Sequence, residues 1–275
     1  MVADGLIQSK AFSLWLNDLG SNTGSILFGG VDSEKYTGPL ETLPIQSGSG
    51  VFSEFLITLT DIQLGTQSIS SNIALAVLLD SGSSLTYLPD EIVQDIFNVV
   101  DGRYDTDEGV AYVPCSLASE NKNLTFTFSS PKIAVSMKEL VLNLVTNNGK
   151  RPAFEDGVPA CLFGIAPAGR GTNVLGDTFL RSAYVVYDLD NNEISLAQTR
   201  FNTTSSAVLE IGTGNKAVPH ATSVAEAVKA TQGIVRGNAK LRSSAAAAPA
   251  KPLMGAVSAA AMALTINFLL TTTFA

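Results

Sequence analysis

V-L-L-D-S-G-S-S-L-T-Y-L, residues 77–88, places a single carboxylate directly after an apolar run. The apolar residues Val77 to Leu79 predict a buried strand, and the small residues after Asp80 predict a turn with several hydrogen-bond donors. One aspartate can accept a proton, but peptide hydrolysis by aspartates uses two carboxylates that share one proton. A second Asp-Ser-Gly or Asp-Thr-Gly is absent from these 275 residues. The motif therefore predicts a carboxylate that needs a partner.

Three motifs occur in the same order as in one known family. Leu79 to Ser84 resembles the second active-site loop of the pepsin-like aspartic proteases, which carry Asp-Thr-Gly or Asp-Ser-Gly once in each of two β lobes. Phe28 to Gly38 resembles the strand and crossover that join the lobes, and is most similar to the fungal candidapepsin and yapsin type. Val174 to Arg181, followed by Tyr184 to Asp188, resembles the closing segment. The resemblance covers about residues 5–200.

This resemblance implies an all-β, pepsin-like bilobal fold, present here mainly as the C-terminal lobe with one or two short helices. We expect residues 1–45 to be a remnant of the N-terminal lobe and the inter-lobe crossover, and residues 46–200 to be the C-terminal lobe. Met1 to Lys10 has neither the basic nor the apolar region of a secretory signal, and it resembles the interior of a first lobe. The N-terminal lobe, with its own aspartate, is thus expected to be missing from the chain.

The pattern of apolar residues independently favours an all-β domain. Apolar residues make up 45% of the chain, and short apolar or alternating runs are separated by Gly, Asn and Ser. These predicted strands are 52–59, 124–128, 141–145 and 184–187. One helix is predicted over Pro89 to Val100, where an apolar stripe would pack beneath the strand that leads to Asp80.

The residues of the turn have roles around Asp80: those of Gly82 and Ser83 follow from their chemistry, whereas those of Ser81 and Ser84, like the catalytic role of Asp80, are implied by the resemblance. The Gly82 backbone N–H would lie close to the carboxylate, and the Ser83 hydroxyl would donate to its outer oxygen. Ser81 would cross-link two active-site loops, and Ser84 would face the substrate. Behind this loop, residues 174–176 would form a packed strand and a tight approach. The alternative to a catalytic Asp80 is a structural one, in which the strand ends in a polar turn and Asp80 only accepts hydrogen bonds from that turn.

Charge and rare residues exclude several classes of function. The net charge of −8 and the pI near 4.7 weigh against nucleic-acid binding, and the sequence has no basic stripe to neutralise phosphates. Acidity suits activity at low pH, although it also serves solubility. His220 is the only histidine and is expected in a solvated linker, so a Ser-His-Asp triad or a histidine-based zinc site is excluded. The resemblance implies no metal and no organic cofactor.

Cysteine and sequon patterns are compatible with the secretory route. Cys115 and Cys161 are the only cysteines, and a disulfide between them is favoured in an oxidising compartment, with two free buried thiols as the alternative. The family commonly bridges two cysteines in this region. Asn123 and Asn202 begin glycosylation sequons.

The C-terminal composition predicts a stalk and a sorting signal. After Phe201 the sequence is rich in Ser, Thr, Ala, Gly and Lys, which predicts a flexible stalk over residues 201–242. Residues 243–275 match a GPI-attachment signal: small residues at Ser243 and Ser244, a spacer, and an apolar tail from Leu253 that would be removed. Asn238 is a competing attachment position, and a retained membrane helix is the alternative. We expect an extracellular, GPI-anchored protein at the plasma membrane or cell wall.

Two functional hypotheses follow. The first is an aspartic endopeptidase that cleaves extended peptides at acid pH, with Asp80 as one of its two catalytic aspartates. The second is a catalytically inactive, surface-anchored lobe that acts as a binding or structural module, which is the outcome expected for the isolated chain. A dimer in which each chain supplies one Asp80 is a third arrangement, disfavoured by the long segment before Gly38.

Overall fold

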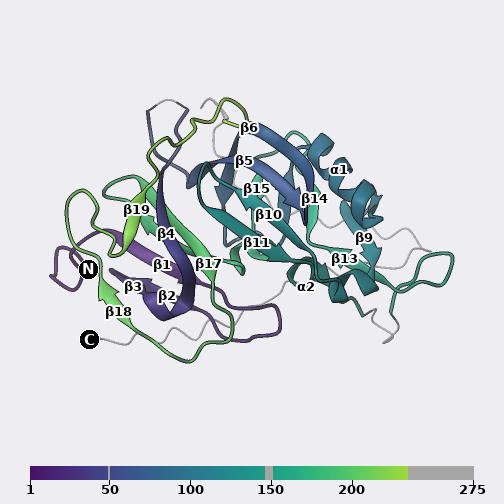
Figure 1. Cartoon of the computed structure of the whole chain (residues 1–275), viewed down its shortest axis with the longest axis horizontal. Helices are drawn as coiled ribbons and strands as arrows, with labels where there is room; N and C mark the ends of the chain where they lie inside the picture. Colours follow the sequence, from purple (N-terminus) through teal and green to yellow (C-terminus); the bar gives the residue numbers. More distant parts are fainter. Residues whose placement is uncertain (49, 146–150, 235–275) are drawn as a thin grey trace, which may run out of the picture.

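The computed structural model describes residues 1–48, 50–145 and 151–234. Over these ranges the chain folds into β-sheets of six, seven, four and two strands, with three short α-helices. Figure 1 shows the six-stranded sheet at lower left and the seven-stranded sheet at upper right. The predicted all-β class is confirmed.

The six-stranded sheet joins residues from both ends of the chain. Its order is β19-β4-β17-β16-β1-β2. The strands are β1 (Ala11–Trp15), β2 (Ser25–Phe28), β4 (Tyr36–Pro44), β16 (Ala183–Asp188), β17 (Glu193–Thr199) and β19 (Ala221–Ser223). All six residues of β16 are buried, which suits its place between β1 and β17. Because β1 and β4 pair with β16 and β17, residues on both sides of the boundary predicted at residue 45 share this sheet, and the boundary itself stays a prediction.

The seven-stranded sheet carries the motif strand. Its order is β11-β10-β5-β6-β15-β7-β14. The strands are β5 (Leu56–Leu64), β6 (Gln67–Leu79), β7 (Thr86–Leu88), β10 (Asn123–Thr127), β11 (Lys132–Ser136), β14 (Ile165–Pro167) and β15 (Val174–Leu175). β5 and β6 form an antiparallel hairpin, whereas β15 runs parallel to the end of β6 with Leu175 opposite Leu79. The sheet therefore holds the last residues of β6 on both sides and ends it at Asp80.

The predicted helix is α1 (Asp90–Val100), with Pro89 as its N-cap residue. It buries Val93, Ile96, Phe97 and Val100 and contacts β6, as expected. Two further α-helices were not predicted individually, α2 (Met137–Leu140) and α3 (Asp177–Leu180), and two 3₁₀ turns are η1 (Ser33–Lys35) and η2 (Cys115–Ser119). Throughout the described ranges, no helix has the length and apolarity needed to cross a membrane.

The remaining sheets are small. The four-stranded sheet has the order β12-β13-β9-β8, and the two-stranded sheet pairs β18 with β3. Their strands are β3 (Gly30–Asp32), β8 (Arg103–Asp105), β9 (Val110–Pro114), β12 (Val141–Leu142), β13 (Ala160–Phe163) and β18 (Val208–Glu210). Cys115 and Cys161 form a disulfide between η2 and β13, which confirms the favoured pairing.

The predicted stalk is wrong over its first part. Residues 201–234 lie along the domain, because β18 pairs with β3 and β19 pairs in parallel with β4. Ile211 and Val218 are buried in the same apolar cluster as Trp15. Polar composition suggested a solvated segment, but a few apolar residues and backbone pairing suffice to hold it. The rest of the stalk and the predicted attachment positions lie outside the described residues.

Candidate active site

Asp80 stands where β6 leaves the sheet. Its backbone N–H donates to the Leu175 carbonyl over 3.2 Å, which extends the pairing with β15 by one residue. Ser83 then donates its N–H to the Asp80 carbonyl, closing a tight turn. Val77 and Leu79 are buried, whereas Ser81 and Gly82 are exposed. The carboxylate is thus carried by a fixed strand and presented at the surface.

The turn supplies one donor to each oxygen of the Asp80 carboxylate. The Gly82 N–H donates to Oδ1 over 2.9 Å and the Ser83 hydroxyl donates to Oδ2 over 2.8 Å, as the sequence predicted. Ser84 is exposed, and the expectation that it faces a substrate stays a prediction. The Ser81 side chain makes no hydrogen bond with any described residue, so its expected cross-link between loops stays a prediction. Together the two bonds to Asp80 hold its carboxylate in one orientation.

Gly176 lets the chain after β15 press against this turn. A Cβ at that position would lie 2.3 Å from the carbonyl oxygens of both Ser83 and Leu85. The next two residues fasten the contact, since Asp177 donates its N–H to the Ser83 carbonyl and Thr178 donates to the Ser84 carbonyl. Residues 174–176 therefore take the backing role predicted for them, through a close approach that a residue with a Cβ could not make.

Asp177 had no predicted role, yet its carboxyl is buried directly behind the turn. The residue is 7% exposed, and its Oδ1 has no hydrogen-bond partner among the described residues. The pKa of Asp177 is raised to about 6, mainly by burial. The positive charge of Arg181 lowers this pKa, and the negative charge of Asp80 raises it further. The signal available in the sequence was an acid directly after a glycine within an apolar segment.

A buried ion pair fixes the far side of α3. Arg181 donates from Nε to Oε2 of Glu139 over 2.7 Å, and from Nη2 to the Glu139 carbonyl over 2.7 Å. Glu139 is 2% exposed and also accepts the Leu19 N–H over 2.9 Å. With its guanidinium directed to Glu139, Arg181 makes no side-chain hydrogen bond to Asp177 within the described residues.

The comparison with known families agrees with this geometry. A family model described as eukaryotic aspartyl protease matches residues 1–199, which include the Asp80 turn and the segment that backs it. This chain belongs to the eukaryotic aspartyl protease family.

Several fungal proteins of the family are similar to the chain. It is 61% identical over 234 residues to the "Probable aspartic-type endopeptidase opsB" of Aspergillus oryzae, and 56% identical over 233 residues to the protein of that name in Aspergillus fumigatus. In both cases 83% of this chain and 47% of the relative are covered. Candidapepsin-3 of Candida albicans is 38% identical over 206 residues, covering 74% of the chain and 48% of the relative. The chain thus spans about half the length of the curated relatives it matches.

Aromatic side chains lead from this aspartyl protease turn to the edge of the six-stranded sheet. Phe12 stacks on Tyr187 with ring centroids 4.7 Å apart, and Phe55 meets Tyr187 edge-on at the same distance. Burial, followed by the charge of Asp80, raises the pKa of Tyr187. On the other side Phe12 lies 6.2 Å from Phe28, which is 45% exposed on edge strand β2. An aromatic series therefore runs from Phe55, whose carbonyl accepts the Leu79 N–H, to the exposed Phe28.

The other predicted site residues lie away from Asp80. Asn123 and Asn202 are both exposed, and the Asn202 amide donates to Asp18 over 2.7 Å. His220 lies beside β19 and not in a free linker. Asn238, Ser243 and Ser244 lie outside the described residues. No group of three or more His, Cys, Asp or Glu side chains is placed to hold a metal ion in the part of the chain that the structure describes.

Proposed function

We propose that this chain is the C-terminal part of an aspartic endopeptidase and that Asp80 is one of its two catalytic carboxylates. The observation that carries the proposal is the exposed turn in which Gly82 and Ser83 each donate one hydrogen bond to the Asp80 carboxylate. One donor on each oxygen leaves further lone pairs available. Those lone pairs can accept hydrogen bonds from a water molecule and from a second, protonated carboxyl group.

The reaction requires a proton to be shared between Asp80 and that second carboxyl. Asp80 in the ionised form accepts a proton from water, which attacks the peptide carbonyl, while the protonated partner donates to the carbonyl oxygen. Two carboxylates that share one site cannot both ionise, because their like charges repel, and this keeps one of them protonated. Asp177 cannot serve as the partner, because it lies buried behind the turn with its N–H bound to Ser83.

The second carboxylate is proposed to come from an N-terminal lobe outside these 275 residues. Strand β2 is an edge of the six-stranded sheet, and its Ile26 and Phe28 side chains are 42% and 45% exposed. An edge strand with exposed apolar side chains offers both backbone hydrogen bonds and apolar area to a partner. Phe28 also lies 6.2 Å from Phe12, which stacks on Tyr187, so a lobe bound there would cover the exposed end of this aromatic series.

The test compares Asp80→Asn with wild type in the complete protein, using internally quenched peptides between about pH 3 and pH 6, where a shared-proton pair operates. We expect kcat to fall about a thousandfold or more, because a member of a catalytic unit is removed. Asp95→Asn, which changes an exposed aspartate on α1, is the matched control and should retain activity. Equal activity of Asp80→Asn and wild type would refute the proposal.

The isolated chain provides a second comparison. Residues 1–275 alone should not cleave the same peptides, since one carboxylate cannot supply both the base and the acid. Cleavage by the isolated chain that a pepstatin-type inhibitor blocks would contradict the need for another lobe. If the complete protein is also inactive, the alternative holds, namely a surface lobe that binds peptides or proteins without cleaving them.

We further propose that the protein works outside the cell, held at the surface by a GPI anchor. The disulfide between Cys115 and Cys161 supports an oxidising compartment, and the exposed Asn123 and Asn202 are accessible to glycosylation. Treatment of intact cells with a phosphatidylinositol-specific phospholipase should release the protein into the medium. A protein that stays with the membrane fraction, or that is found in the cytosol, would contradict this location.

A further inference from the structure

The segment after the family match, residues 200–233, is fastened along the domain at several separate points. The match to the family model ends at residue 199, where β17 also ends, whereas the similarity to the Aspergillus oryzae relative covers 83% of the chain and so extends beyond it. Beyond it the chain runs past η1, pairs with β3, pairs with β4 and reaches β6. We call residues 200–233 the clamp.

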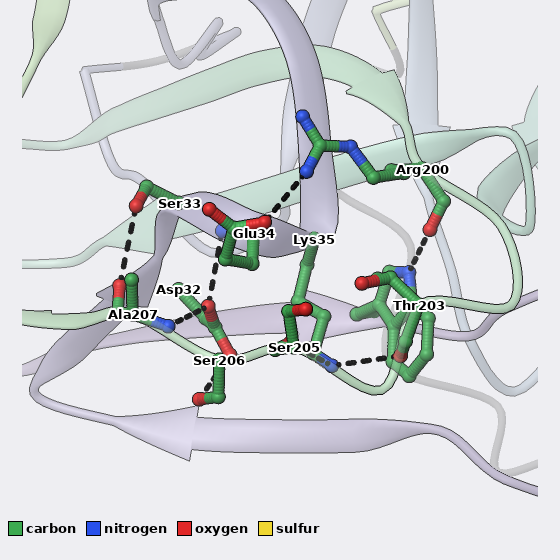
Figure 2. Close-up of polar contacts among 10 residues, drawn as sticks. Asp32, Ser33, Glu34, Lys35, Arg200, Thr203, Ser205, Ser206 and Ala207 are labelled. Atoms are coloured by element: carbon green, nitrogen blue, oxygen red, sulfur yellow. Dashed lines mark hydrogen bonds and ion pairs between the residues drawn. The ribbon is translucent and has the colours of Figure 1, made fainter.

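Asp32 is the first fastening point and lies in the left half of Figure 2, above Ser206. Its side chain is nearly buried, with 7% exposure of the residue. The Ser206 hydroxyl donates to Oδ2 over 2.7 Å, and the Ala207 N–H donates to Oδ1 over 2.8 Å. Oδ1 also accepts the Glu34 N–H over 3.1 Å, which caps η1. The Asp32 carboxylate therefore joins η1 to the clamp through charge-assisted hydrogen bonds.

Lys35 is the second fastening point. Its ammonium lies 4.4 Å from the centroid of the Trp15 ring and donates to the carbonyls of Thr203 and Ser205 over 3.1 and 3.0 Å. The Arg200 guanidinium forms an ion pair of 2.7 Å with Glu34, and the Arg200 backbone N–H donates to the Lys35 carbonyl. Figure 2 shows these contacts converging from the clamp and from η1. Because the ammonium binds backbone carbonyls, it orders the path of the clamp.

Between its ends the clamp binds both large sheets. β18 and β19 add backbone pairing to β3 and to β4 of the six-stranded sheet. The Val228 N–H then donates to the Ser129 hydroxyl, and the Ala230 N–H donates to Oε1 of Gln46. Ser129 lies just after β10 of the seven-stranded sheet. The clamp thus crosses from one sheet to the other.

The clamp ends against β6, the strand that leads to Asp80. The Ala76 N–H donates to the Gln232 carbonyl over 2.8 Å, and the Thr231 and Gln232 N–H groups donate to the Ala74 carbonyl. Gly233 fits tightly there, because a Cβ would lie 2.7 Å from both the Ala76 oxygen and an Asn173 nitrogen. Ala76 precedes Asp80 by four residues, which is about 13 Å along a strand.

We propose that the clamp fixes β6 to the six-stranded sheet, so that the folded unit that carries Asp80 extends to Gly233 and does not end at Thr199. The strand that positions the carboxylate then depends on a segment outside the family match. This dependence is a property of the fold of this chain and stands whether or not the protein cleaves peptides.

The first test replaces Gly233 by alanine and measures amide hydrogen exchange in the complete protein. Gly214→Ala is the matched control, because both glycines lie in the clamp with positive φ, 75° and 81°, but a Cβ at Gly214 meets nothing within 4 Å. Both variants therefore carry similar backbone strain. We expect the Ala76 amide to exchange about tenfold faster or more in Gly233→Ala, and to remain near the wild-type rate in Gly214→Ala.

The Val77 amide, in the β5–β6 pairing, reports whether the whole sheet has loosened. The proposal requires acceleration that is larger at Ala76 than at Val77. Unchanged exchange at Ala76 in Gly233→Ala, or equal acceleration at both amides, would overturn it.

A second pair of variants tests the other end of the clamp. Ser206→Ala removes the hydroxyl that binds Asp32, whereas the Ser205 side chain makes no hydrogen bond with a described residue, so Ser205→Ala is its control. We expect the Ser33 amide, which donates to the Ala207 carbonyl, to exchange several-fold faster in Ser206→Ala only. The same exchange rate in both variants would show that the Asp32 contact does not hold the clamp.

Discussion

Asp177→Asn removes the carboxyl whose pKa the fold raises to about 6, while keeping its size and shape. An aspartate with a folded-state pKa above its unfolded value of 3.8 binds its proton more tightly when folded. The contribution of protonated Asp177 to the free energy of unfolding is therefore fully present below pH 3.8 and is lost as the pH rises through about 6. The wild type should lose stability across this window, and Asp177→Asn should lose less.

The size of the effect follows from the shift. A rise of about two pKa units corresponds to about 3 kcal/mol at full effect. Partial solvent screening reduces the expected value to about 1–2 kcal/mol. The unfolding free energy of Asp177→Asn relative to wild type should thus increase by about 1–2 kcal/mol between about pH 4 and pH 7.

Urea unfolding at a series of pH values from about 4 to 8, with the disulfide intact, measures this difference. Glu193 also has a raised pKa, through burial and then the charge of Asp188, but it titrates in both proteins and cancels in the comparison. A difference that is constant with pH would refute the reasoning. So would a relative loss of stability in Asp177→Asn as the pH rises, because it would mean that the buried carboxylate is stabilised in its ionised form.

Two further experiments, a double cysteine replacement and a pair of glycine variants, test the support of the domain and of the Asp80 turn. Replacing both Cys115 and Cys161 by serine removes the disulfide, which closes a loop with a sequence separation of 46. The free energy of unfolding, measured with urea, should fall by about 4 kcal/mol. A fall of less than about 1 kcal/mol would contradict the loop-entropy argument. Gly176→Ala places a Cβ 2.3 Å from the Ser83 carbonyl oxygen and should lower the free energy of unfolding by about 3 kcal/mol. Gly212→Ala is the control, because a Cβ there meets nothing within 4 Å, and it should change the free energy of unfolding by less than about 0.5 kcal/mol. Equal melting temperatures for the two alanine variants would show that the close approach at Gly176 is not required.

The local features of the Asp80 turn were predictable because its hydrogen bonds span only two or three residues. Gly82 and Ser83 donate to the side chain of Asp80 in the way that the motif indicated. The helix over Asp90–Val100 followed from its apolar stripe for the same reason. Prediction was weaker for strand ends, since the run expected to start at Phe52 becomes a strand only at Leu56. Pairing partners far away in the sequence decide where a strand begins.

Asp177 and the clamp could not be predicted from local patterns. Asp177 lies 97 residues after Asp80, and its raised pKa depends on burial that only the packing of α3 behind the turn creates. The clamp has the polar composition of a linker, yet Asp32 and Lys35 hold it from more than 160 positions away. Composition describes how a segment interacts with water, but it does not show which donors and acceptors elsewhere in the chain will meet it.

The residues alone specify an all-β chain with one carboxylate held by its own turn, because alternation, turn chemistry and short-range hydrogen bonds are written within a few neighbouring positions. The burial of Asp177, the Glu139 and Arg181 ion pair and the attachment of the clamp to β6 depend on contacts between distant segments. Such contacts exist only once the sheets have formed. Asp80 is therefore recognisable from its neighbours in sequence, while the surroundings that hold and tune it are a property of the folded domain.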